Sequence, residues 1–201
     1  MNALYTIGHS NHDAAQFVSL LTAHGVSAVA DVRSNPYSKY VPQFSKENLQ
    51  HLLREAGIDY AFFGRELGAR RDEEACYVDG QAQYARIAAL PIFRAGLDRI
   101  LTESEDHTIA LMCSEADPLE CHRTILVCRE ALKRRPGLRI EHILSGADIE
   151  AHDEAIARLV AQHKLAPELF GELSTPEGLA ERAYDLQAER IAYTRDRKGA
   201  A

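Results

Sequence analysis

Short, continuous apolar runs recur along this chain, and they alternate with segments that show helical periodicity. Five such runs lie at residues 3–10, 26–34, 58–64, 107–113 and 138–146. Strands that are apolar on both faces are typical of a parallel sheet covered by helices on both sides. We therefore predict an α/β fold with a mostly parallel five-stranded sheet and Rossmann-like or flavodoxin-like layering.

The segments between these runs carry helix start and stop signals. Asp13, Ser45 and Thr175 can each cap a helix, and Pro91 predicts a break within one. Residues 65–83 show no period and predict a long loop. The expected helices span residues 14–25, 46–57, 84–104, 118–135, 148–163 and 176–193.

The chain has 201 residues, of which 46% are hydrophobic, which suits one domain with its own core. Because Pro167 and Gly171 interrupt the pattern, we place one α/β domain over residues 1–163 and a helical C-terminal arm with a frayed tail over residues 164–201. The arm is expected to pack on the domain or on a second copy of the chain, which would make a homodimer.

The net charge and the cysteine content limit which binding partners and which cellular compartment we expect. The formal net charge of −7 argues against direct binding of nucleic acid, although a local basic cluster could still permit it. The four cysteines show no paired framework, and we see neither a membrane-length apolar stretch nor a signal-like N-terminus. We therefore expect no membrane partner and a location in the reducing cytoplasm.

Reactive side chains follow three of the expected strands. Because the carboxyl ends of parallel strands meet at one edge of the sheet, we expect these side chains to share one cleft. An ion-pair network would give the same pattern. The residues concerned are His9 and Ser10, Asp31 and Arg33, and Cys113 and Glu115.

The stretch LMCSEADPLECHR, residues 111–123, joins the fourth strand to its helix. Asp117 fits the helix N-cap, and Glu120 can reach back to the N–H of that residue. In a continuous helix Cys121 falls on the apolar face with Cys128, so packing accounts for much of Cys121 and all of Cys128. His122 and Arg123 lie off that face.

These positions suggest roles in a reaction. Cys113 is the candidate nucleophile or acid/base, with a buried structural thiol as the competing interpretation. His122, His9 and Glu115 are the accompanying acid/base candidates, although His9 could equally cap the first helix. Arg33 and Arg123 are expected to hold an anion between them.

Further residues are assigned to ligand binding. Asp31 can pair with Arg33 or contact the ligand. Ser10, at the end of the first strand, is expected at the same edge of the sheet. Tyr37 belongs to an aromatic segment, residues 36–44, that can form a flap over a base or sugar or simply cover its own domain. The long loop adds Arg65, Arg70, Arg71 and Cys76. His142, within an apolar strand, is expected to be a hydrogen-bonded core residue.

Metal binding is the alternative interpretation of the same stretch. Cys113, Cys121 and His122 carry ligands that suit zinc, but their spacing matches no standard zinc motif and no second pair completes it. The preferred assignment therefore contains no metal. The residues do not identify a cofactor.

Several of these segments occur together in a known family. The pieces TIGHS, DVRSNPYS, FFGRELG, ALMCSEADPLECHR and HIL appear in this order over residues 3–147. In this respect the chain resembles the uncharacterised family DUF488. The resemblance implies an α/β fold with a site built from these motifs, and it supplies no reaction. Family members often have two glycines after the loop leucine, whereas here Gly68 is followed by Ala69.

The sequence therefore favours an enzyme that acts on a small anionic ligand, phosphorylated or nucleotide-like, at the carboxyl edge of the sheet. A metal-binding protein and a non-catalytic module for a ligand or nucleic acid are the alternatives.

Overall fold

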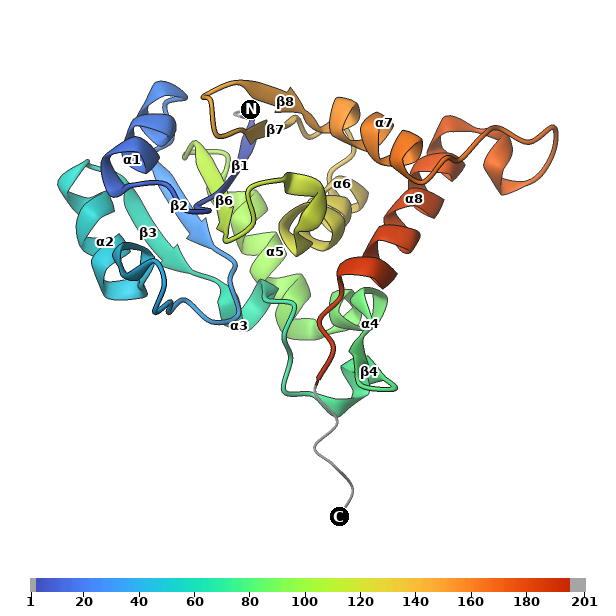
Figure 1. Cartoon of the computed structure of the whole chain (residues 1–201), viewed down its shortest axis with the longest axis horizontal. Coiled ribbons are helices and arrows are strands. Elements are labelled where there is room, and N and C mark those ends of the chain that lie inside the picture. The colour runs from blue at the N-terminus through green and yellow to red at the C-terminus, as the bar shows by residue number, and fades with distance from the viewer. Residues whose placement is uncertain (1–2, 196–201) are drawn as a thin grey trace, which may run out of the picture.

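The computed structural model describes residues 3–195 and contains a six-stranded sheet of order β3-β2-β6-β1-β7-β8 (Figure 1). Five of its strands pair in parallel, and β8 pairs antiparallel with β7. The predicted α/β fold is confirmed, and the five expected strands all form. The strands are β1 (Leu4–Gly8), β2 (Ala28–Asp31), β3 (Asp59–Phe62), β6 (Ile109–Cys113), β7 (Ile140–Ile143) and β8 (Ile149–Ala151).

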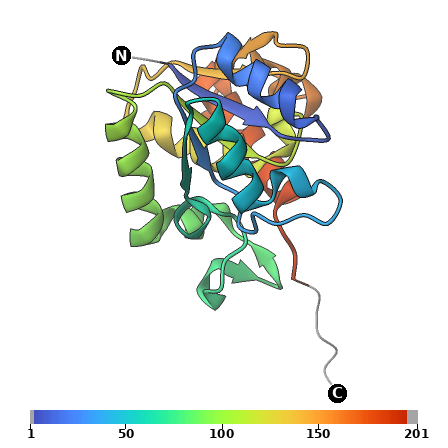
Figure 2. The same cartoon turned by 90° about the vertical axis from the view of Figure 1, so that its left-hand side faces the viewer.

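Helices cover both faces of this sheet because its central strands are apolar on both faces. Helices α1 (Ala14–Ala23) and α2 (Lys46–Glu55) bury Phe17 and Leu49 against one face. In Figure 2 the sheet separates these two helices from α5. The helices that contribute to the core on the other face are α3 (Gly64–Leu67), α4 (Tyr84–Ala89), α5 (Pro91–Glu103), α6 (Arg129–Arg134), α7 (His152–Gln162) and α8 (Pro176–Ile191).

The helix boundaries follow the predicted signals in most places. The side chain of Asp13 accepts a hydrogen bond from the N–H of Gln16 at 2.7 Å, and that of Thr175 caps α8. The break predicted at Pro91 separates α4 from α5. Ser45 stands at the N-cap of α2, but its hydroxyl accepts from the N–H of Ser38 instead.

The segment predicted as one helix over residues 118–135 is interrupted, and this correction bears on the site. A 3₁₀ turn, η3 (Pro118–Glu120), ends at Cys121, whose backbone is extended with φ −133° and ψ 139°. A π-helical segment, η4 (Arg123–Cys128), then leads into α6. Because the helix restarts after Cys121, the helical spacing counted from Pro118 does not hold, and Arg123 turns toward the interior.

Two other segments differ from the prediction. Residues 149–151 form the edge strand β8, so the helix expected from residue 148 begins at His152. The expected loop contains α3, the 3₁₀ turn η2 (Glu74–Cys76) and a hairpin of β4 (Tyr77–Val78) and β5 (Gln81–Ala82). The hairpin turn is Asp79-Gly80, and both residues have positive φ, as a two-residue hairpin turn requires.

The C-terminal helix packs on its own domain. Leu179, Ala183 and Tyr184 of α8 are buried, and α8 contacts α7 and η4. Leu169 and Phe170, in the connection before α8, are exposed. The homodimer expected through this arm remains a prediction, and these two side chains are where it can be tested. The remaining short turns are η1 (Pro42–Phe44) and η5 (Glu172–Ser174).

Residues 3–195 include no helix that is both long enough and apolar enough to span a membrane.

Candidate functional site

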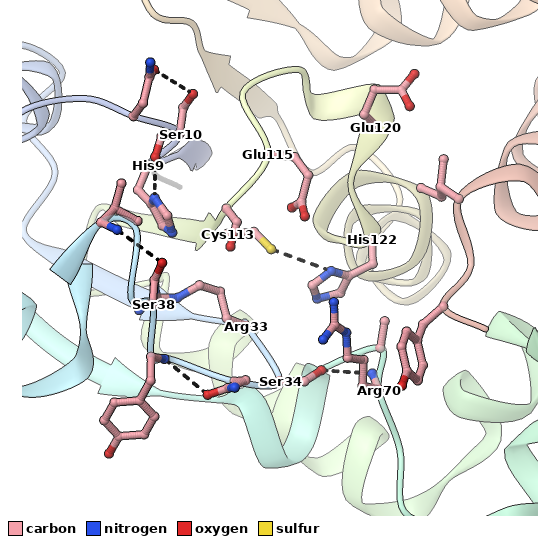
Figure 3. A pocket seen from close by; sticks show the side chains of 18 of the residues that line it. His9, Ser10, Arg33, Ser34, Ser38, Arg70, Cys113, Glu115, Glu120 and His122 are labelled. Carbon is pink, nitrogen blue, oxygen red and sulfur yellow. Dashed lines mark hydrogen bonds between the residues drawn. The ribbon is translucent and has the colours of Figure 1, made fainter. Parts of the chain in front are cut away.

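The carboxyl ends of β1, β2 and β6 meet at a cavity of about 650 Å³, which we call the cleft. Hydrogen bonding continues past the strand ends, since the N–H of His9 donates to the carbonyl of Cys113 at 2.8 Å. The cleft is lined by His9, Ser10, Asn11, Arg33, Ser34, Asn35, Tyr37, Ser38, Val41, Ala69, Arg70, Tyr84, Cys113, Ser114, Glu115, Glu120, His122, Ile191 and Tyr193. Figure 3 shows most of these side chains.

A glycine lets these strand ends approach closely. A Cβ atom on Gly8 would lie 1.8 Å from the carbonyl oxygen of Glu115. Any larger residue would therefore separate the turn after β1 from the loop after β6. Gly8 thus holds His9 and Cys113 in neighbouring positions.

Cys113, Cys121 and His122 form a compact cluster at the cleft. Nδ1 of His122 lies 3.7 Å from the sulfur of Cys113 and 3.9 Å from that of Cys121 (Figure 3 draws the first contact). Nε2 of His122 lies 3.0 Å from the carbonyl oxygen of Val32. A carbonyl only accepts, so Nε2 carries the hydrogen, and in the neutral ring Nδ1 presents a lone pair to both sulfurs.

The two thiols differ in their surroundings. Hydrogen bonding to Cys121, together with burial, raises the pKa of Cys113 well above its usual value. Burial also disfavours the thiolate of Cys121, but the hydrogen bond from Cys113 and the charge of Arg123 outweigh it and lower the pKa of Cys121. The pair therefore holds its proton on Cys113 and its negative charge on Cys121.

His122 responds to this charge. Burial alone would lower the pKa of His122, but the hydrogen bond to Cys121 and the negative charge of that thiolate raise it. The cluster can therefore hold a proton on the imidazole opposite a thiolate, which is the arrangement of an activated thiol.

Glu115 points into the space between Cys113 and His122, whereas Glu120 points away from them (Figure 3). Burial, followed by the nearby negative charge of Cys121, raises the pKa of Glu115. A carboxyl group in this position keeps its proton to a higher pH than an exposed glutamate does, so it can donate that proton to a ligand. Glu120 does not reach back to the cap as predicted, and it forms an ion pair with Arg190 of α8.

His9 lies on the β1 side of the cleft and stacks on Phe44, with ring centroids 4.6 Å apart. Its Nδ1 lies 2.9 Å from the carbonyl oxygen of Ser10, so that nitrogen carries the hydrogen. Burial lowers the pKa of His9 to about 4. Nε2 is buried and has no hydrogen-bond partner among residues 3–195. The neutral ring thus offers an unused acceptor at the cleft.

Arg33 lines the cleft from the end of β2, as the sequence places it. Its Nε and Nη2 donate to the carboxylate of Asp31 at 2.9 and 2.6 Å, and the hydroxyl of Tyr60 donates to the same carboxylate. Asp31 is fully buried and does not line the cleft. Asp31 therefore orients Arg33, and Nη1 of Arg33 makes no hydrogen bond within the described part of the chain.

Arg123 is not at the cleft, contrary to its expected position on the helix surface. Its side chain is 0% exposed, and the guanidinium donates to the carbonyl oxygens of Glu115 and Ala116 at 2.6 and 3.2 Å. Arg123 therefore stabilises the loop after β6 by bonding two of its backbone carbonyls. The interruption of the helix at Cys121 explains this inward direction.

Arg70 is the second arginine that lines the cleft. Its guanidinium lies 4.7 Å from the ring centre of Tyr193, and its backbone N–H donates to the hydroxyl of Ser34 at 2.9 Å. In Figure 3 it points toward His122. The sequence marked Arg70 as one of several loop arginines, and only the fold separates it from Arg65 and Arg71, which do not line the cleft.

The remaining predicted residues lie at the rim or in the core. Ser10 and the half-exposed Tyr37 line the cleft, and the hydroxyl of Tyr37 donates to Glu47 at 3.0 Å.

Cys121 is buried as expected, but it lies beside Cys113 and His122. Cys76 and Cys128 are buried in the core. No local pattern in the sequence points to Tyr84, Ile191 and Tyr193, which reach the cleft from distant parts of the chain.

The fold and cleft together define an α/β protein whose parallel strands present a thiol–imidazole cluster at their carboxyl edge. The profile described as "Domain of unknown function DUF488" matches residues 13–129, which is more than half of the chain. The chain therefore belongs to the DUF488 family. The matched span contains Arg33, Arg70, Cys113 and His122, and it leaves out the TIGHS and HIL segments. Comparisons with curated proteins and with solved structures find no match.

Proposed function

We propose that this protein is an enzyme that acts on a small anionic ligand, phosphorylated or nucleotide-like, and that Cys113 is its nucleophile. One observation carries the proposal. Cys113 lines a cleft of about 650 Å³ beside a histidine whose free nitrogen faces its sulfur, and two arginines line the same cleft. That volume suits a nucleotide-sized or smaller molecule.

The arginines are suited to the anionic part of the ligand. Arg33 is oriented by its hydrogen bonds to Asp31, and Arg70 lines the same cleft from the segment after α3. Two guanidinium groups from different elements can fix one phosphate or carboxylate in a single orientation. We assign the clamp to Arg33 and Arg70, since the guanidinium of Arg123 is bonded to backbone carbonyls. Ser10 and Tyr37 are placed to contact the rest of the ligand at the rim.

The reaction follows from the cluster. The thiol of Cys113 gives its proton to the thiolate of Cys121, to which it is hydrogen-bonded, and its sulfur forms a bond to the electrophilic atom of the ligand. The leaving group departs with its electron pair and a proton from His122 or Glu115. The unpartnered Nε2 of His9 can accept a hydrogen bond from the ligand or from an attacking water. The chemistry needs a reduced thiol, which favours a reducing compartment such as the cytoplasm.

The first experiment is a thermal-shift screen of nucleotides and sugar phosphates, followed by turnover assays on each hit. We expect Arg70→Ala to weaken binding by about tenfold or more. The control is Arg65→Ala, because Arg65 is an exposed arginine of the same loop that does not line the cleft. Equal losses in both variants would contradict a specific clamp.

A non-catalytic binding module is the competing function. It would need the arginines but not the thiol, so binding without turnover in the wild-type protein would favour it over the enzyme. A hit that wild-type protein converts, and that Cys113→Ser binds without converting, would support the enzyme.

A further inference from the structure

We propose that Cys113, Cys121 and His122 bind a thiophilic divalent cation of the zinc class. Within residues 3–195, this is the one group of at least three cysteine, histidine or acidic side chains whose potential ligand atoms all lie within 4.8 Å of one another. Two thiolates and an imidazole are a preferred ligand set for zinc.

The distances fit a tetrahedral ion. With metal–sulfur and metal–nitrogen bonds of zinc length, a sulfur and a nitrogen bound to the same ion lie about 3.6 Å apart. Nδ1 of His122 lies 3.7 and 3.9 Å from the two sulfurs. Both nitrogen–sulfur distances are therefore close to those of ligands on a single ion, and the two sulfurs lie within 4.8 Å of each other.

The imidazole is already oriented for this task. A histidine that ligates a metal usually donates its other N–H to a carbonyl or carboxylate, which fixes the ring and the nitrogen that faces the ion. Here Nε2 of His122 donates to the carbonyl of Val32, so Nδ1 faces the sulfurs. This contact joins β2 to the cluster and holds the ring in place.

The backbone around Cys121 supports a thiolate ligand. The N–H of Arg123 donates to the sulfur of Cys121 at 3.4 Å, and N–H groups directed at sulfur stabilise bound thiolates. This contact depends on the extended conformation of Cys121 that interrupts the helix. The unusual local structure therefore places a ligand, which simple core packing of Cys121 would not require.

The fourth position of such a site faces the cleft. Cys113, His122 and Glu115 all line the cleft, and Glu115 points into the space between the other two (Figure 3). A carboxylate, a water or the ligand itself can complete the coordination there. Three protein ligands with one open position are typical of zinc sites that take part in chemistry, whereas structural sites usually have four.

This inference goes beyond the proposed thiol reaction, because a bound cation uses the sulfur of Cys113. The metal-bound and free-thiol forms are two states of one cluster, and only the second can use Cys113 as a nucleophile. Metal loading is then expected to suppress the thiol reaction, and chelation to restore it.

The test is a titration of the full-length reduced protein, free of any histidine tag, with Co²⁺ as a spectroscopic substitute for zinc. We expect one equivalent to give a sulfur-to-cobalt charge-transfer band and the intense visible bands of a tetrahedral site, both removed by one equivalent of Zn²⁺. Cys121→Ser and His122→Gln should weaken binding at least about tenfold. Cys128→Ser and Cys76→Ser are matched controls, since both thiols are buried and neither belongs to the group of three close ligand atoms, and they should leave the bands unchanged.

Two results would overturn the proposal. One is the absence of a charge-transfer band in folded, reduced wild-type protein, and the other is a band that Cys121→Ser leaves unchanged. If Cys121→Ser does not fold, X-ray absorption at the zinc edge of the loaded wild-type protein decides, because the proposal requires two sulfur ligands and a shell with fewer than two refutes it. These readouts need no substrate, so they stand apart from the proposed enzyme, whose turnover is measured with chelator present.

Discussion

Two buried polar clusters lie close together in this protein, and they differ in how completely their atoms are paired. The cluster at the cleft has an unpartnered nitrogen on His9 and two thiols that share one proton. The second cluster, which we call the histidine network, consists of Thr6, His142, His152 and Tyr184.

The histidine network is fully paired. The hydroxyl of Thr6 contacts Nδ1 of His142 at 2.8 Å, Nε2 of His142 contacts Nδ1 of His152 at 3.0 Å, and Nε2 of His152 contacts the hydroxyl of Tyr184 at 2.6 Å. Each ring nitrogen has one partner, and one hydrogen on each ring satisfies the whole chain. His142 is thus the hydrogen-bonded core residue that its position in an apolar strand predicts.

This difference in hydrogen bonding indicates which cluster serves stability and which serves chemistry. A buried polar group with every hydrogen bond made contributes to a defined core, whereas a buried group left without a partner is costly unless something else binds it. The histidine network therefore fixes how β1, β7, α7 and α8 pack, and the cleft retains capacity for a ligand. Substitutions should affect stability in the first cluster and activity in the second.

The largest expected effect is on activity at the cleft. Cys113→Ser should lower turnover of an identified substrate at least about 10³-fold, because a serine hydroxyl is a far weaker nucleophile than a thiolate. Ligand affinity should stay within about threefold, and the free energy of unfolding within about 1 kcal/mol. Steady-state kinetics and urea denaturation measure these quantities, with Cys128→Ser as the matched control. Full activity of Cys113→Ser would show that its thiol is only a packing group.

Acid should destabilise the protein through its neutral buried histidines. Burial is the main cause that lowers the pKa values of His9 and His152 from 6.5 to about 4 and that of His142 to about 2. Below pH 6.5 the unfolded chain binds protons that the folded protein does not, so the free energy of unfolding falls as the pH falls. Each histidine lowers the free energy of unfolding by up to about 1.4 kcal/mol per pH unit below pH 6.5. The three together therefore lower it by about 4 kcal/mol at pH 5.5 relative to neutral pH.

Urea denaturation between pH 7.5 and 5 measures this slope. His122 adds nothing to it below pH 6.5, because its pKa is raised and both states are then protonated. His152→Gln should reduce the slope by the share of one histidine. A stability that stays level between pH 7 and 5.5 would mean that the buried rings are already charged or become hydrated.

Arg123 tests the distinction between the two clusters, because it is a cation that contacts both the histidine network and the loop beside the cleft. It donates to two carbonyls of the loop after β6, and its Nε lies 3.4 Å from the hydroxyl of Thr6. Arg123→Ala should leave these acceptors buried without donors and open a cavity, lowering the free energy of unfolding by about 3 kcal/mol. Arg70→Ala, at the exposed end of the cleft, should change it by about 0.5 kcal/mol or less. Equal stability of the two variants would show that Arg123 is not structural.

The sequence predicted the part of the site that depends on topology. Parallel strands bring their carboxyl ends to one edge, so the sequence alone predicts that His9, Arg33 and Cys113 lie together. The β-strand period also placed Asp31 beside Arg33. These inferences need only the order and direction of the strands.

Side-chain direction after the fourth strand could not be predicted in the same way. The inference for Arg123 assumed one continuous helix, and a single extended residue at Cys121 turns the side chain of Arg123 inward instead. Tyr84 and Tyr193 reach the cleft through tertiary packing, to which no local pattern points. The edge strand β8 was missed for a related reason, since Ile149–Ala151 is too short to show a period before α7.

The smallest effect concerns one hydroxyl of the histidine network. Tyr184→Phe keeps the ring that stacks on His152 and contacts Arg129, but it removes the partner of Nε2 of His152. The loss of one buried hydrogen bond should lower the free energy of unfolding by about 1–2 kcal/mol and leave turnover unchanged. The control is Tyr84→Phe, because the hydroxyl of Tyr84 makes no hydrogen bond to any described residue and its ring lines the cleft. Tyr84→Phe should change stability by about 0.5 kcal/mol or less while altering ligand affinity. If Tyr184→Phe instead lowers turnover at constant stability, the histidine network is coupled to the cleft and the division between the two clusters is wrong.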